Sequence, residues 1–150
     1  MRSLSHLPII RRFKKHPFWL AITTAGAVLL VDQLSKLWAT SAQLVTFNTG
    51  ISFGLLEDSQ RAVSLLVTIT LVGLLILGFR KYVQSHPVET GLFLGGALAN
   101  VLDRLIYGGV RDWLPLLVVP YKNNVADWAI FAAVASIVIS QLTTQEAAVS

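Results

Sequence analysis

One segment of this chain, residues 62–79, runs for 18 residues without a charged side chain and is predominantly apolar. A helix of about 20 mostly apolar residues is the length that crosses a bilayer core of about 30 Å. The whole chain is 54% hydrophobic and 13% charged, against a charged share of about 25% in soluble proteins. A soluble fold could not bury that much apolar surface, so the sequence predicts an integral membrane protein.

Three further segments are long enough to span a bilayer, although polar residues interrupt them. We expect one all-α membrane domain, residues 1–150, with spans at about 17–37, 62–79, 88–107 and 125–142. In the first span the apolar part, residues 17–31, covers only about 22 Å at about 1.5 Å per residue. To cross, this helix must carry Asp32 into or near the membrane, which costs about 2.5–3.5 kcal/mol on insertion scales. Such a carboxylate is a candidate functional residue.

The positions of lysine and arginine predict the orientation. The N-terminal tail and the link that contains Arg80 and Lys81 hold seven of the twelve basic residues, and with four spans both segments lie on one side. The side richer in basic residues is cytoplasmic, so we expect both termini there and the loops 38–61 and 108–124 outside. Cleavage of the N-terminus as a signal peptide is the alternative. Asp32, Gln33 and Lys36 interrupt the region before the cleavage point and favour a retained helix.

Composition also excludes some functions. The chain has no cysteine, which removes disulfides, thiolate catalysis and cysteine-ligated metals. The net charge of +4 does not indicate nucleic acid, because the basic residues of the tail precede an apolar segment and form no patch interleaved with aromatic residues.

Polar residues recur at helical spacing of three and four at three places, all expected at the outer ends of spans. These groups are Asp32, Ser35 and Lys36; Asn100, Asp103 and Arg104; and Asn124 and Asp127. Residues at this spacing share a helix face, so the groups converge at the outer interface. Anchoring of helix ends is the alternative, but carboxylates are poor anchors compared with Lys, Trp or Tyr. Small residues at Gly91, Gly95 and Ala99, and at Ala132, Ser136 and Ser140, predict close helix packing.

Five short motifs follow one another in order, at matching places relative to the four expected spans. They are residues 32–36 (DQLSK), 48–53 (NTGISF), 95–104 (GGALANVLDR), 109–113 (GVRDW) and 124–127 (NVAD). In this order they resemble the motifs of the lipoprotein signal peptidase family, also called signal peptidase II, over residues 20–140.

The resemblance implies an aspartic endopeptidase that cleaves prolipoproteins before a diacylglyceryl-modified cysteine, with Asp112 and Asp127 as the catalytic pair. Two carboxylates that share one proton can activate a water and polarise a carbonyl, and need no metal or other cofactor. By similarity, eight residues shape the site or position the substrate: Asp32, Lys36, Asn48, Gly50, Asn100, Asp103, Arg104 and Asn124. Asp103 is the rival of Asp112 for a place in the pair. The family pattern, which puts the catalytic residue in the loop after Gly-x-Val-x, favours Asp112.

The resemblance further implies the bacterial inner membrane, an active site at its extracytoplasmic face, contact with membrane lipids and inhibition by globomycin. A monomer is the simplest state. In the family the segment between Asp32 and Asn48 helps to form a small extracytoplasmic β-platform. It is shorter here, so the size of the platform stays open, and Ala99 and Trp113 replace the usual glycine and phenylalanine.

Two other classes of function compete. A small ion or proton transporter also places carboxylates in its spans, but favours the midplane and broken helices. A non-catalytic scaffold would tolerate the loss of Asp112 or Asp127.

Overall fold

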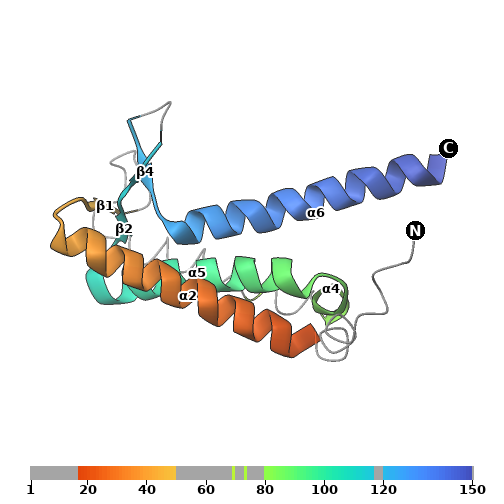
Figure 1. Cartoon of the computed structure of the whole chain (residues 1–150), viewed down its shortest axis with the longest axis horizontal. Coiled ribbons are helices and arrows are strands. Elements are labelled where there is room, and N and C mark those ends of the chain that lie inside the picture. Colours follow the sequence, from red (N-terminus) through yellow and green to blue (C-terminus); the bar gives the residue numbers. More distant parts are fainter. Residues whose placement is uncertain (1–16, 50–68, 70–72, 74–79, 117–119, 150) are drawn as a thin grey trace, which may run out of the picture.

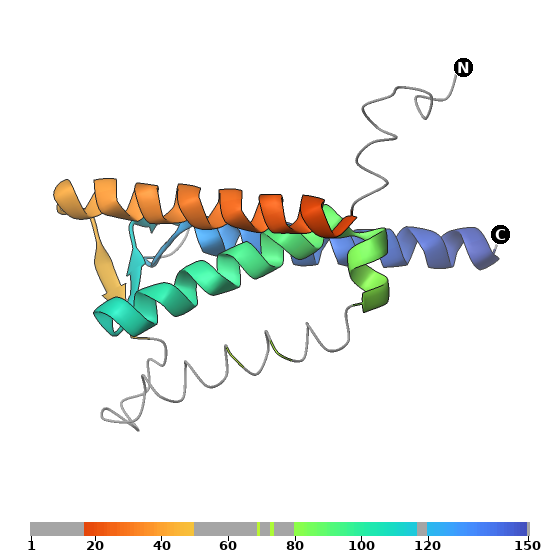
Figure 2. The same cartoon turned by 90° about the horizontal axis from the view of Figure 1, so that it is seen from below.

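The structure is a computed structural model that describes residues 17–49, 69, 73, 80–116 and 120–149. Three long helices form its body: α2 (Pro17–Ser41), α5 (Pro87–Tyr107) and α6 (Val125–Val149). α5 packs against both α2 and α6, which touch each other less. α2 and α5 run in the same direction and α6 runs in the opposite one (Figures 1 and 2). Gly50 and the expected span 62–79, apart from positions 69 and 73, lie outside the described residues.

Helix ends follow local chemistry. A short helix, α4 (Arg80–Ser85), precedes α5, which begins at Pro87, where proline's fixed φ suits a first helical position. α5 ends at Gly108, whose φ of 76° is left-handed and whose N–H donates to the Arg104 carbonyl. α2 continues four residues past the predicted end at residue 37 and reaches Ser41. α2 and residues 125–143 of α6 are long and apolar enough to cross a membrane, and most of their residues are not buried in the protein.

Glycine brings the helices of this bundle into close contact. A Cβ at Gly95 would lie 2.6 Å from the Ala25 carbonyl oxygen of α2. A Cβ at the next residue, Gly96, would lie 2.5 Å from the Ala126 carbonyl oxygen of α6. Both distances are shorter than any real Cβ contact, so the two glycines let α5 approach both neighbours at once. The close packing predicted at Gly91 and Gly95 is confirmed.

The packing face predicted for α6 is confirmed only in part: the Ser136 hydroxyl donates to Glu89 Oε1 on α5 at 3.2 Å, but the small residues that are buried are others. Ala126, Ala129 and Ala133 are buried, whereas Ala132 and Ser136 are exposed. The two sets of small residues have helical spacing and are offset along the helix, so the sequence could not choose between them. Contacts at the start of α6, described below, set its rotation about its axis.

Two small antiparallel sheets lie at one end of the helices (Figure 1). In the first, β1 (Thr46–Asn48) pairs with β2 (Val110–Asp112), with Asn48 opposite Val110 and Thr46 opposite Asp112. In the second, β3 (Leu114–Pro115) pairs with β4 (Lys122–Asn123). The protein is therefore mostly helical with small sheets, which agrees with the helical fold expected from the sequence; among the described residues, two helices are long and apolar enough to span a membrane.

Candidate active site

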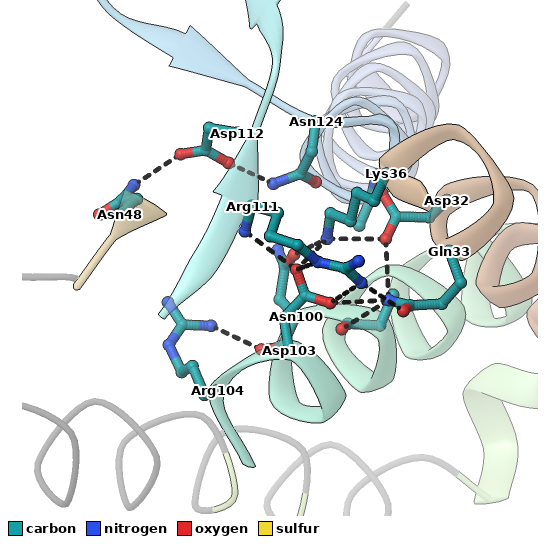
Figure 3. A network of polar contacts seen from close by, with 12 residues as sticks. Asp32, Gln33, Lys36, Asn48, Asn100, Asp103, Arg104, Arg111, Asp112 and Asn124 are labelled. Carbon is teal, nitrogen blue, oxygen red and sulfur yellow. Dashed lines mark hydrogen bonds and ion pairs between the residues drawn. The ribbon is translucent and has the colours of Figure 1, made fainter. Parts of the chain in front are cut away.

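The sheet end of the bundle also holds the polar residues singled out in the sequence. α2 supplies Asp32 and Lys36, and α5 supplies Asn100, Asp103 and Arg104. The strands supply Asn48 and Asp112, and the start of α6 supplies Asn124 and Asp127. Figure 3 shows that most of these side chains, which come from different helices and strands, point toward one another. The three polar groups thus converge as their spacing predicted, while Gly50 lies outside the described residues.

Asp112 is held between two side-chain amides. Its carboxylate accepts a hydrogen bond from Asn124 Nδ2 at 2.6 Å on Oδ1 and from Asn48 Nδ2 at 2.9 Å on Oδ2. Only 3% of the residue is exposed. Burial raises the pKa of the Asp112 carboxyl above its ordinary value of 3.8, against the opposing effect of the two amide hydrogen bonds.

Asn124 connects Asp112 to Asp127. It precedes the first residue of α6, and its Oδ1 accepts the Asp127 backbone N–H at 3.0 Å, the hydrogen bond of a helix N-cap. Its Nδ2 donates to Asp112. One side chain therefore caps the helix that carries Asp127 and binds the opposite carboxylate.

Asp127 accepts a hydrogen bond from Asn100 Nδ2 on Oδ1 at 2.8 Å. Asn100 is fixed in turn, because its Oδ1 accepts a hydrogen bond of 3.1 Å from Lys36 Nζ. The carboxylates of Asp127 and Asp112 lie close enough to interact electrostatically. The two aspartates proposed from the resemblance therefore interact electrostatically, and the amides that hold them come from three parts of the chain.

A cluster of buried ion pairs is linked to Asp127 through Asn100 and Lys36. Lys36 Nζ is 2.7 Å from Asp32 Oδ2 and 3.2 Å from Asp103 Oδ2, and all three side chains are fully buried. Asp32 Oδ1 accepts the Ala126 backbone N–H at 2.9 Å. Asp32 thus holds the first turn of α6, and with Asn124 it determines which face of α6 meets α5.

Arg111 and Gln33 belong to the site, although the sequence did not single them out as site residues. The guanidinium of Arg111 donates to Asp103 Oδ1 at 2.8 Å through Nη2, and to Gln33 Oε1 at 2.8 Å. Gln33 Nε2 donates to Asp103 Oδ1 at 3.0 Å. A basic residue directly before a candidate aspartate was the available signal, but one sequence cannot show which way its side chain points.

Arg104 supplies a further positive charge. Its Nη1 donates to the Asn100 carbonyl at 3.2 Å, and its charge interacts with those of Asp127, Asp112 and Asp103. Its Nε is buried without a hydrogen-bond partner among the described residues. The positive charge of Arg104 therefore acts on all three carboxylates.

Comparison with known proteins identifies the family. The signature of the family described as "Signal peptidase (SPase) II" matches residues 24–143. The lipoprotein signal peptidase of Caulobacter vibrioides is 31% identical, over 85% of this chain and 89% of the relative. That of Methylorubrum extorquens is 35% identical, over 77% and 81%, and that of Aquifex aeolicus 31% identical, over 92% and 95%.

Solved structures share the fold. One bacterial membrane enzyme superposes with a TM-score of 0.70 and 24% identity, over 81% of this chain and 92% of that one. Another superposes with a TM-score of 0.68 and 23% identity, over 83% and 88%. These superpositions show the fold class of the chain, a bundle of apolar helices with small sheets at one end. The chain belongs to the signal peptidase II family, and it is therefore a protease.

Proposed function

We propose that this protein removes signal peptides from diacylglyceryl-modified bacterial prolipoproteins, and that Asp112 and Asp127 perform the cleavage. The substrate is that of the relatives named lipoprotein signal peptidases. The bond cleaved is the one before the lipid-modified cysteine.

The hydrogen-bond and ion-pair partners of the four aspartates support the choice of the catalytic pair. In the described part of the chain, the carboxylates of Asp112 and Asp127 accept hydrogen bonds from neutral amides and form no salt bridge. Asp32 instead forms an ion pair with Lys36, and Asp103 forms ion pairs with Lys36 and Arg111. A carboxylate in a buried ion pair is held ionised and cannot exchange a proton easily. This difference supports Asp112 over Asp103.

The proposed reaction is hydrolysis by a carboxyl pair that shares one proton. The ionised carboxylate takes a proton from a water molecule, and the resulting hydroxide adds to the scissile carbonyl carbon. The protonated carboxyl donates a hydrogen bond to the carbonyl oxygen, on which negative charge develops near Arg104. The C–N bond then breaks as a proton passes to the leaving amine. The step needs water as its only co-reactant.

We further propose the arrangement in the membrane. Four helices span the bacterial inner membrane as a single domain, both termini are cytoplasmic, and the sheets form a small platform at the extracytoplasmic face. The diacylglyceryl group of the substrate would approach from the lipid, and the chain would act as a monomer. Globomycin would inhibit the enzyme by binding at the same site.

Replacement of either aspartate tests the proposal. Asp112→Asn and Asp127→Asn keep size and hydrogen bonding but cannot exchange the proton, so each should abolish cleavage of a purified diacylated lipobox peptide. The double variant should be little worse than either single variant, because groups that act as one unit are not additive. Losses that multiply would indicate two independent supporting roles instead.

Asp103→Asn is the matched control. It should lower activity or stability without the complete loss, because Asp103 orders the site through Arg111 and Lys36. Near-normal cleavage by Asp112→Asn, together with no cleavage by a folded Asp103→Asn variant, would transfer the catalytic role to Asp103. A wild-type protein that does not cleave the peptide at all would favour a transporter or a scaffold.

A further inference from the structure

Arg111 is the largest side chain in the fully buried set, with 2% of the residue exposed. It lies on β2, directly before Asp112. Successive side chains of a strand point to opposite faces. Asp112 accordingly faces Asn48 and Asn124, while Arg111 reaches into the helices (Figure 3). A guanidinium is costly to bury unless its donors are satisfied, so its contacts require an explanation.

Arg111 donates hydrogen bonds to Asp103 from both its backbone and its side chain. Its backbone N–H donates to Asp103 Oδ2 at 2.9 Å, Nε donates to the same oxygen at 3.3 Å, and Nη2 donates to Oδ1 at 2.8 Å. The two side-chain contacts form the planar fork by which arginine binds a carboxylate, which lysine cannot reproduce. β2 is thereby tied to α5 at the residue next to Asp112.

Two further contacts hold the same guanidinium. Nη2 also donates to Gln33 Oε1 on α2 at 2.8 Å. The guanidinium carbon lies 4.1 Å from the centre of the Tyr107 ring, at the end of α5. Arg111 thus joins β2 to α2 through Gln33 and to α5 through Asp103 and Tyr107.

We propose that Arg111 is a positioning residue, whose bidentate hold on Asp103 fixes β2 so that Asp112 stands opposite Asp127. This inference rests on the proposed function, because it assumes that Asp112 reacts. In the described part of the chain the Arg111 side chain contacts Asp103, Gln33 and Tyr107, and not the pair itself. Its effect should therefore appear in the rate of the chemical step, where a displacement of about 1 Å can cost about a hundredfold.

A purely structural role is the alternative. Arg111 and Lys36 together balance the charges of Asp32 and Asp103, and charge balance alone would require only a cation at position 111. Lysine supplies the cation without the fork. Arg111→Lys therefore separates the two roles, and it also avoids the unpaired buried Asp103 charge that Arg111→Gln would leave and that could prevent folding.

The experiment compares kcat, KM and unfolding temperature for the wild type, Arg111→Lys and Arg111→Gln, in one detergent and with a diacylated lipobox peptide. Lys122→Gln is the matched control, because Lys122 is an exposed cation at the other sheet that donates to the Leu44 carbonyl. We expect a folded Arg111→Lys with kcat lower by about tenfold or more and KM nearly unchanged. Lys122→Gln should keep both constants.

Wild-type kcat in folded Arg111→Lys, or a loss confined to KM or to unfolding temperature, would overturn the positioning role. Asp112→Asn is measured alongside. An active Asp112→Asn would refute the proposed function itself, whereas an inactive Asp112→Asn with normal kcat in Arg111→Lys would refute only the inference about Arg111.

Discussion

Four aspartates of this site have the same side chain and different surroundings. Asp32 and Asp103 are fully buried against cations. Asp112 is just as inaccessible, yet its two oxygens accept hydrogen bonds from the amides of Asn48 and Asn124. An amide stabilises a carboxylate less than a full positive charge does, so the charged form of Asp112 is held less firmly than a cation would hold it.

The surroundings of Asp112 predict a pH dependence. Burial raises its pKa, so the carboxyl pair keeps its proton to a pH above the ordinary value of 3.8, and cleavage should fall only as pH rises through the higher folded-state pKa. The Asn48 hydrogen bond opposes this shift. Asn48→Ala should therefore raise the pKa further and move the alkaline limb of the rate profile to higher pH.

The measurement is the rate of peptide cleavage against pH for the wild type and Asn48→Ala. A limb that stays in place, or moves to lower pH, would show that this hydrogen bond does not control the titration. The stability of the folded protein should change with pH in the same direction as the cleavage rate. A raised carboxyl pKa adds stability that is fully present below pH 3.8 and is lost as pH rises through the folded-state pKa.

At the level of elements, the site depends on how closely α5 approaches its neighbours. Its polar residues Asn100 and Asp103 follow the two glycines that contact α2 and α6. Asp32 and Asn124 then hold the first turn of α6. The packing of small residues and the polar contacts thus act on the same helices, and a change in one is transmitted to the other.

Gly95→Ala tests the helix contact. The new Cβ would lie 2.6 Å from the Ala25 carbonyl oxygen, so the helices must separate. We expect the free energy of unfolding to fall by about 1–3 kcal/mol, with slower cleavage, because Asn100 and Lys36 lie farther along the same interface.

Gly26→Ala on α2 is the control for helix propensity, since no heavy atom lies within 4 Å of a Cβ built there. It should unfold at the wild-type temperature or above it, as alanine favours helix by about 1 kcal/mol relative to glycine. Thermal unfolding in detergent measures both variants. Equal behaviour of the two would show that the predicted contact does not constrain the helices.

At the scale of the whole molecule, the sheets lie at one end of the helices (Figure 1), and β1 and β2 supply Asn48 and Asp112 to the polar site. The chain has no natural cysteine, so single cysteines report on sidedness without background. Ser41 and Tyr121 are exposed at the sheet end, and Ser85 is exposed just before α5.

Cysteine at Ser41 or Tyr121 should react with a membrane-impermeant thiol reagent from the extracytoplasmic side of intact cells, and cysteine at Ser85 only after the membrane is opened. The reason is the excess of lysine and arginine expected on the cytoplasmic side. Labelling of Ser85→Cys alone in intact cells would invert the topology. Labelling of all three variants would contradict the spans themselves.

The sequence by itself determined the class of the protein and most members of the polar site, but not Arg111 and Gln33. Apolar length predicted helices that could span a membrane, and spacing of three and four placed Asp32 with Lys36 and Asn100 with Asp103 on common faces. Both signals are local, because one turn of helix brings such residues together whatever the rest of the chain does. The order of the five motifs indicated the family to which the chain belongs.

Only the tertiary structure decided which aspartate pairs with which partner. Spacing along one helix could not tell whether Asp103 binds its neighbour Arg104 or the more distant Arg111, nor whether α6 packs through Ala132 or Ala133. These choices depend on the rotation of each helix and on the direction of β2. Both are set by contacts between residues far apart in sequence, such as Asp32 with Ala126 and Gln33 with Arg111, and no local pattern encodes them.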